Sequence, residues 1–208
     1  AAALEFGDSR LSDGGKGQPL VAKVSVDADN QTATFAFDKP LAPGRYTLST
    51  AYRGTINTQA NGLFALDYPT DSGKKRALFT QFENSDARRF IPSWDEPGFK
   101  ATFDLTLNVP SAQMAVSNMP ATGTRELGNG LKQVVFQTTP KMSTYLLFMS
   151  AGEFERSAVT ADNGTEIGVV VPAGKLSQAQ FALDASRDVI AEYNDYFGVP
   201  YPLPKLDN

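Results

Sequence analysis

The part of the sequence best equipped for chemistry is Leu78–Pro97, where four acidic and two basic side chains stand together with amide groups. If residues 77–83 form a strand, Gln81 and Glu83 point to the same face, with Cα atoms about 6.7 Å apart. An amide and a carboxylate at that spacing can together bind a small cationic ligand, such as an ammonium group. The alternative is that both side chains only line the solvated face of an edge strand, which is the commoner case for a Gln-x-Glu pattern.

The residues after this pair predict a structural brace. Arg88 and Arg89 are expected in one or two helical turns that end soon afterwards. Asp95 and Glu96 follow in a turn and are close enough along the chain to form ion pairs with the two arginines. We expect these four side chains to hold the connection in place rather than to act in catalysis, and Trp94 to be packed.

Composition excludes several classes of protein and site. The chain has no His and no Cys, so it lacks the usual zinc ligands, a Ser-His-Asp or Cys-His arrangement and any disulfide. Carboxylates, Lys and Tyr are the remaining acid–base groups. The net charge is -4, and no basic run is longer than residues 74–76, which argues against nucleic acid as a partner. No apolar run approaches the roughly 20 residues of a transmembrane segment.

Alternating apolar and polar residues predict a mainly β fold. The clearest strand is Ala101–Val109, in which Phe103, Leu105, Leu107 and Val109 share one face. Further strands are expected at residues 21–26, 32–37, 45–53 and 131–137. Asn-Gly pairs at residues 61–62, 129–130 and 163–164 are typical of hairpin turns. Together these patterns indicate an all-β sandwich or barrel.

The pattern changes near the end of the chain, where Lys175–Gly198 predicts a helix. Ser177 and Gln180 have the spacing of a capping box, and Gly198 suits the residue that ends the helix. An apolar stripe follows the helical period: Phe181, Ala185, Val189, Tyr193 and Tyr196. Three prolines after Gly198 predict an extended segment that leads away from the helix, so we expect the chain to be the front of a longer protein.

A series of motifs resembles the N-terminal domain of the M1 family of zinc aminopeptidases, the gluzincins. The motifs are Thr80–Glu83, Asp86–Arg89, Pro92, Trp94–Pro97 and Phe99–Phe103, supported by Pro43–Leu48, Tyr52–Gly54, Gly62–Phe64, Ser117–Pro120, Met142–Leu146, Tyr196–Gly198 and Tyr201–Pro202. Their order and number make the resemblance specific, and it covers nearly the whole chain, most weakly over residues 1–20.

The resemblance implies a fold and a division of the chain. Residues 1–174 would form a saddle-like, multistranded antiparallel β-sandwich that lacks its first strands. Residues 175–208 would form one C-terminal helix and an extended lead, starting the junction to a missing thermolysin-like catalytic domain. The zinc ligands and general base of the parent enzyme would lie beyond Asn208, so this chain alone would be inactive.

The resemblance also implies roles for the polar residues. Gln81 would line the S1 side of the cleft, and Glu83 would help to hold the free α-amino group of a peptide substrate. Arg88, Arg89, Asp95 and Glu96 would brace that wall. The partners would then be peptides with a free N-terminus and the catalytic domain of the same protein, with zinc bound outside residues 1–208.

Two other interpretations stay open at this stage. The chain could be a free-standing β-sandwich module that binds glycans or proteins, although most of its aromatic residues alternate inward. It could also belong to an M1-like scaffold that has lost its zinc ligands. The small-residue start and the lack of cysteine favour a bacterial periplasm or envelope slightly over the cytoplasm.

Overall fold

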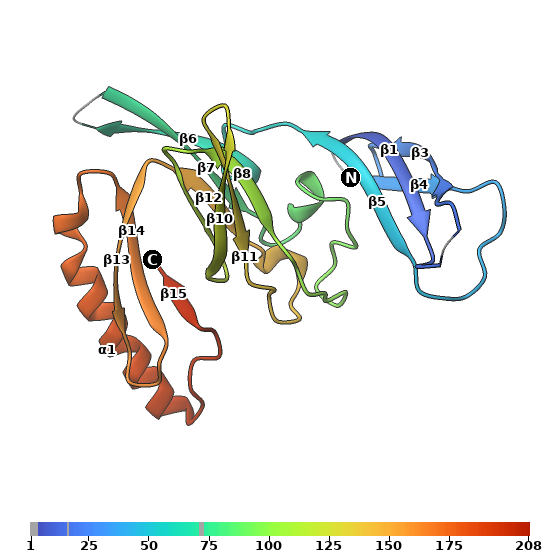
Figure 1. Cartoon of the computed structure of the whole chain (residues 1–208). Coiled ribbons are helices and arrows are strands. Elements are labelled where there is room, and N and C mark those ends of the chain that lie inside the picture. The colour runs from blue at the N-terminus through green and yellow to red at the C-terminus, as the bar shows by residue number, and fades with distance from the viewer. Residues whose placement is uncertain (1–3, 16, 71–72) are drawn as a thin grey trace.

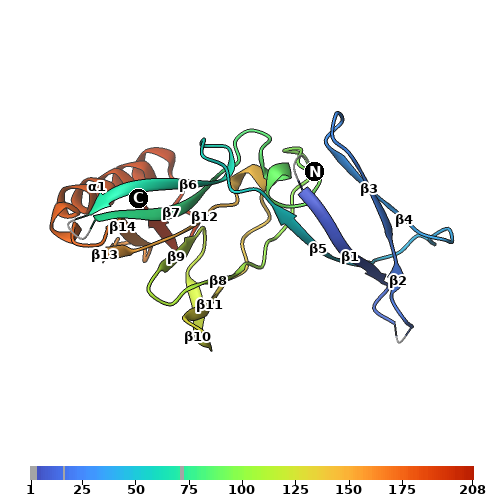
Figure 2. The ribbon, with the colours of Figure 1, turned by 90° about the horizontal axis from the view of Figure 1, so that it is seen from above.

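The computed structural model describes residues 4–15, 17–70 and 73–208. Over these residues the chain forms mostly antiparallel strands and a single α-helix, so the predicted mainly β class is confirmed. Figures 1 and 2 show three groups of elements that follow one another from one end of the molecule to the other. The N-terminal strands lie at one end, and the helix with the last strands lies at the opposite end.

The N-terminal group consists of a small sheet and a hairpin. Its strands are β1 (Leu4–Ser12), β2 (Leu20–Val21), β3 (Lys23–Asp27), β4 (Thr32–Ala36) and β5 (Thr47–Gly54). The sheet has the order β2-β1-β5, while β3 and β4 pair only with each other. The three strands expected here are present, and the first of them is interrupted at Ala22, whose N–H bonds the carbonyl of Ser9 at 2.9 Å.

The central group contains two sheets packed together. The first has the order β6-β7-β12-β9, with β6 (Gly62–Thr70), β7 (Gly73–Gln81), β9 (Met114–Ser117) and β12 (Met149–Gly152). The second has the order β10-β11-β8, with β8 (Thr106–Pro110), β10 (Ala121–Gly128) and β11 (Leu131–Phe136). Val109, Val134 and Phe136 pack against Ala151 of the first sheet. β7 has partners on both sides, so the edge strand assumed in the alternative interpretation of Gln81 and Glu83 is wrong.

The strand predicted over Ala101–Val109 is only half regular. β8 begins at Thr106, because the preceding backbone bonds irregularly to residues 136–142, partly through the hydroxyl of Thr139. The predicted alternation is nevertheless confirmed: Phe103, Leu105, Leu107 and Val109 are the less exposed residues of this segment. The burial of alternate side chains needs only an extended backbone, whereas a regular β-strand also needs a partner strand with which to form hydrogen bonds.

The C-terminal group joins a sheet to the helix. Its elements are β13 (Phe154–Thr160), β14 (Glu166–Pro172), the 3-10 helix η3 (Leu176–Gln178), α1 (Gln180–Phe197) and β15 (Lys205–Asp207). The predicted capping box does not form, because Ala179 is the N-cap and makes no side-chain cap bond, whereas Gly198 ends the helix in the left-handed region as expected. The residues after Gly198 do not lead away: β15 returns and pairs in parallel with β14. The expected division after residue 174 therefore falls inside one sheet-and-helix unit.

The helix buries a different face from the predicted stripe. Leu183 and Ile190 are buried against Val169 and Ile167 of β14. Phe181, Val189, Tyr193 and Tyr196 of the predicted stripe are exposed, Phe181 by 84%. Both faces of the helix are apolar, and the one that carries Leu183 and Ile190 packs against β14. In the part of the chain that the structure describes, no helix is long and apolar enough to cross a membrane.

Candidate functional site

The pair singled out from the sequence, Gln81 and Glu83, lies where β7 ends and its connection begins. Thr80 and Phe82 alternate with them and are buried, Phe82 with only 2% of its surface exposed, whereas both polar side chains are exposed. Among the described residues neither polar side chain has a hydrogen bond or ion pair. Both head groups are therefore available to a ligand.

The buried residues around the pair explain why the end of β7 is rigid. The ring of Phe82 lies 5.4 Å from that of Phe90, between centroids, and packs with Ala87 and Leu147. The carbonyl of Phe82 accepts the N–H of Asp86 at 2.9 Å, which starts the 3-10 helix η1 (Ala87–Arg89). The chain around Glu83 is thus tied down on both sides by a small apolar cluster.

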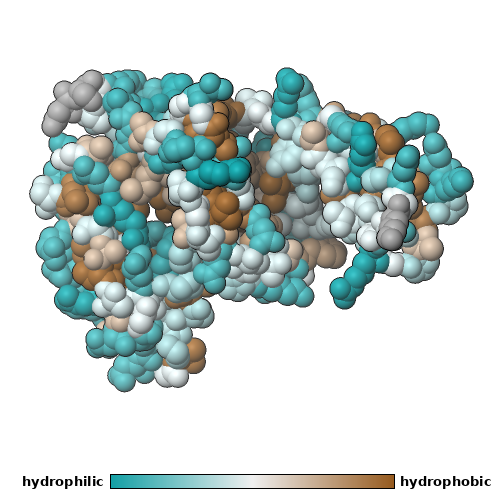
Figure 3. Space-filling model, viewed as in Figure 1, coloured by the Kyte–Doolittle hydropathy of each residue, from teal (hydrophilic) through white to brown (hydrophobic). Residues whose placement is uncertain are grey.

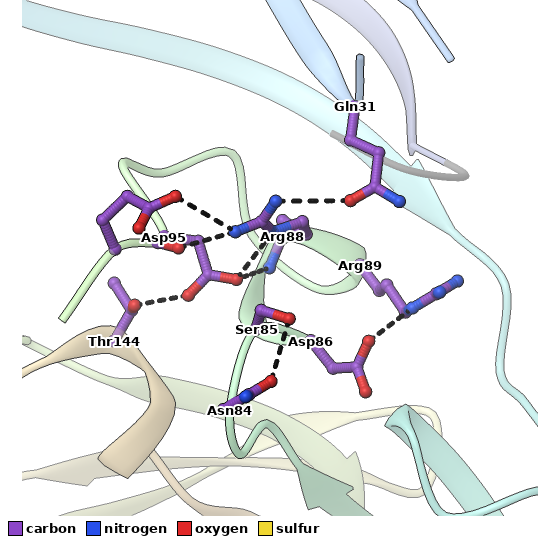
Figure 4. A network of polar contacts seen from close by, with 9 residues as sticks. Gln31, Asn84, Ser85, Asp86, Arg88, Arg89, Asp95 and Thr144 are labelled. Atoms are coloured by element: carbon purple, nitrogen blue, oxygen red, sulfur yellow. Dashed lines mark hydrogen bonds and ion pairs between the residues drawn. The ribbon is translucent and has the colours of Figure 1, made fainter. Parts of the chain in front are cut away.

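Asp95 is the centre of the polar network that follows, shown in Figure 4. One carboxylate oxygen accepts the backbone N–H of Arg88 at 3.0 Å and its Nε at 3.1 Å. The other oxygen accepts the hydroxyl of Thr144, in the 3-10 helix η2 (Thr144–Leu146), at 2.6 Å. Asp95 is buried, and all of these donors converge on its carboxylate, so a buried charge is fully compensated.

The remaining charges of the stretch are held more loosely. Arg89 donates from Nε to Asp86 at 2.6 Å rather than to Asp95 or Glu96. Glu96 is exposed and reaches Arg88 only at 3.7 Å. The guanidinium of Arg88 also donates to the side-chain oxygen of Gln31 at 3.3 Å, which links the connection to the β3–β4 hairpin. The network therefore ties the site to both the N-terminal group and the central group.

Trp94 does not pack as expected. Its side chain is 77% exposed, because the buried position of this turn is taken by its neighbour Asp95. The hydrogen bonds of Asp95 orient the turn, and they leave the indole on the outside. Phe99, after the same turn, is also exposed.

Gly62 lies beside the site, and the sequence marked it as part of an Asn-Gly pair and of a family-like motif but not as a site residue. It faces Gln81 across the β6–β7 ladder and has a φ of +62°. A Cβ at this position would lie 3.1 Å from the Cβ of Arg89. Glycine is therefore required both by the backbone conformation and by the approach of Arg89.

We expect Gly62→Ala to destabilise the chain by more than the about 1–2 kcal/mol that a left-handed backbone costs. Gly198→Ala is the matched control, because its φ is +63° and a Cβ there would meet nothing within 4 Å. Chemical denaturation of both variants measures the difference. Equal losses would show that Arg89 does not restrict Gly62.

Two further residues escaped the sequence reasoning. Thr80 is buried, and its hydroxyl accepts the N–H of Met149 at 3.0 Å. Thr144 supplies the third donor to the Asp95 carboxylate, after the backbone N–H and Nε of Arg88. Thr144 lies in one of the family-like motifs, but no spacing rule predicts that a residue 49 positions away would contact Asp95.

The geometry of Gln81 and Glu83 can hold a cation, whereas the described residues contain no cluster of zinc ligands. An exposed carboxylate and an exposed amide on a rigid strand end suit an ammonium group. Within residues 4–15, 17–70 and 73–208, no three His, Cys, Asp or Glu side chains are grouped as metal ligands. The donor set of the described residues therefore does not fit a zinc site.

Comparisons with known proteins agree with the motifs. The family model described as the peptidase M1 N-terminal domain matches residues 1–146, which include the whole site. The Aminopeptidase N of Acetobacter pasteurianus is 46% identical over 187 residues, which cover 89% of this chain and 52% of that protein. Aminopeptidase M1-A of Oryza sativa subsp. japonica is 42% identical over 187 residues, covering 89% and 21%. Endoplasmic reticulum aminopeptidase 1 of Mus musculus is 35% identical over 185 residues, covering 88% and 20%. The chain thus spans about half of the first relative and about a fifth of the others.

Proposed function

The chain belongs to the peptidase M1 N-terminal domain family, and we propose from this that it forms the substrate-recognising part of a zinc-dependent aminopeptidase. The longer protein would release N-terminal residues from peptides. The names of the three relatives, all aminopeptidases, support this proposal.

The observation that carries the proposal is the exposed pair on the end of β7. The Glu83 carboxylate would bind the α-ammonium group of a peptide, and an internal amide has no such charge to offer. This would explain a requirement for a free N-terminus. Gln81, two residues earlier, would line the S1 side and contact the first side chain of the substrate.

The network around Asp95 would act as a support for this wall. Arg88, Arg89, Asp95 and Glu96 do not reach the exposed head groups; they fix the connection from which Glu83 projects. A ligand that must be held within a few tenths of an ångström needs such a rigid base. Their proposed role is therefore positional.

Zinc would be bound by residues outside this chain. The donor set of residues 1–208 contains no His and no Cys, and we derive no chemical step for the metal from these residues. The catalytic domain of the same protein would be the partner that holds it. By itself the chain would then bind substrate weakly and would not hydrolyse it.

The exposed face of α1 is the surface we assign to that partner. Phe181, Val189, Tyr193, Tyr196 and Phe197 are all exposed, and α1 is continuous with the sheet that β15 completes. On the face shown in Figure 3, by contrast, apolar side chains form small separate groups among polar ones. A concentrated apolar helix face usually marks an interface.

The proposal is tested with a peptide and its N-acetylated form. We expect the longer protein to cleave the free peptide and to leave the acetylated one intact, because acetylation removes the ammonium charge. Residues 1–208 alone, the matched control, should show no turnover of either. Equal cleavage of both peptides, or zinc-dependent turnover by residues 1–208, would contradict the proposal.

A further inference from the structure

A buried lysine joins the C-terminal sheet to the sheet that carries the candidate site. Lys205, the first residue of β15, is 8% exposed. Its Nζ donates to the backbone carbonyl of Ser117 at 2.6 Å, across 88 residues of sequence. Ser117 is the last residue of β9, in the same four-stranded sheet as β7. A lysine is buried in this way only when its charge and donors are satisfied.

Asp207 and Arg156 supply that compensation. The Lys205 ammonium pairs with one oxygen of Asp207 at 2.5 Å, and Arg156 donates to the other oxygen at 2.8 Å. Arg156 also reaches Glu166 at 2.7 Å. Burial alone would lower the pKa of Arg156, but the hydrogen bonds and charges of Asp207 and Glu166 outweigh it and raise that pKa. The cluster therefore pairs the Lys205 side chain with Asp207 and directs its Nζ at Ser117.

A short series of buried hydrogen bonds continues from Ser117 to β7. Ser117 faces Met149 in the β9–β12 ladder, and its hydroxyl donates to the carbonyl of Phe148 at 2.7 Å. Met149 donates its N–H to the Thr80 hydroxyl at 3.0 Å. Thr80 directly precedes Gln81 in the chain. Ser117, Met149 and Thr80 are all buried, so water does not compete for these bonds.

We infer that Lys205 is a positioning residue for the end of β7, which it holds at a fixed place relative to β14, β15 and α1. The inference rests on the proposed function, because it concerns where Gln81 and Glu83 are presented to a peptide amine. The simpler alternative is that Lys205 only stabilises the fold. The two differ in one respect: a positioning residue changes substrate binding at temperatures where the protein remains fully folded.

The first test replaces Lys205 in the longer protein. We expect Lys205→Met to raise KM for a peptide with a free N-terminus about 10-fold with little change in kcat, because a displaced amine site loses binding that substrate and transition state share. Lys205→Arg keeps the charge and the donors, so it should restore KM to within about threefold of the original. Lys39→Met is the matched control, because Lys39 is an exposed lysine in the connection between β4 and β5. An unchanged KM in Lys205→Met would overturn the inference.

The second test removes one hydrogen bond of the same series, the one between Met149 and Thr80, without changing a charged residue. Thr80→Val keeps the side-chain shape and removes the hydroxyl, so it stays informative if Lys205→Met fails to fold. We expect KM to rise about 10-fold in Thr80→Val, and the double variant to be much less than 100-fold impaired, because both changes break one coupled unit. If the two substitutions instead raise KM independently, so that the double variant is about 100-fold impaired, the inference is overturned.

Hydrogen exchange separates this inference from the proposed function. In Lys205→Met, we expect amides of Leu78–Glu83 to exchange about 10-fold faster while those of β10 keep their rate. Faster exchange everywhere would indicate a purely stabilising lysine and overturn the inference. If Glu83→Gln leaves KM unchanged, the amine site is refuted, and the local exchange rates still decide whether Lys205 holds the strand end.

Discussion

Replacing Glu83 by Gln should lower kcat/KM of the longer protein for peptides with a free N-terminus about 10- to 150-fold. This corresponds to about 1.5–3 kcal/mol, the strength of a hydrogen bond that involves a charged group. The substitution keeps the size of the side chain and removes only its charge. Because Glu83 is exposed and its side chain makes no hydrogen bond or ion pair with other described residues, a loss of binding is not expected to come from a damaged fold.

Steady-state kinetics on an amino-acid arylamide, with zinc content measured in each protein, checks this result. Glu126→Gln is the matched control, since Glu126 is an exposed carboxylate on β10, in a different sheet from the site. The loss should shrink when the amine of the substrate is uncharged at high pH. Unchanged kinetics in an active, zinc-loaded variant would reduce Gln81 and Glu83 to solvated polar residues.

Replacing Asp95 by Ala should cost about 3–5 kcal/mol of unfolding free energy. The change leaves the backbone N–H and Nε of Arg88 and the hydroxyl of Thr144 without their acceptor. Asp95 is almost completely buried, so water cannot fully replace the carboxylate. We expect the connection that carries Glu83 to loosen as a consequence.

Equilibrium denaturation of the variant and the unchanged chain measures the cost. Glu96→Ala is the matched control, because this neighbouring carboxylate is 68% exposed and reaches Arg88 only at 3.7 Å. It should cost less than about 1 kcal/mol, as exposed ion pairs do. A similar, small loss in both variants would show that the Asp95 network contributes little to the fold.

Local patterns in the sequence predicted the side-chain directions well. The alternation at Ala101–Val109 and the exposure of Gln81 and Glu83 between buried neighbours follow from the two-residue period of an extended chain. The position of Gly198 at the end of α1 follows in the same way from glycine's freedom in the left-handed region. Each of these features depends on a few consecutive residues.

Errors arose where a partner distant in the sequence was needed. β7 is an interior strand because it pairs with β12, about 70 residues later. Trp94 is exposed because its neighbour Asp95 turns inward and accepts a hydrogen bond from Thr144. The buried face of α1 is likewise the one that packs against β14, and it differs from the apolar stripe predicted from the helical period.

The amino-acid sequence was enough to predict the β class, the family motifs and the shared exposure of Gln81 and Glu83, because short-range periodicity and residue types encode all three. The contact of Asp95 with Thr144, the return of β15 to the sheet and the link from Lys205 to Thr80 emerged only from the folded chain. Each of these joins residues tens of positions apart, and such pairings are selected by the packing of whole sheets rather than by local sequence.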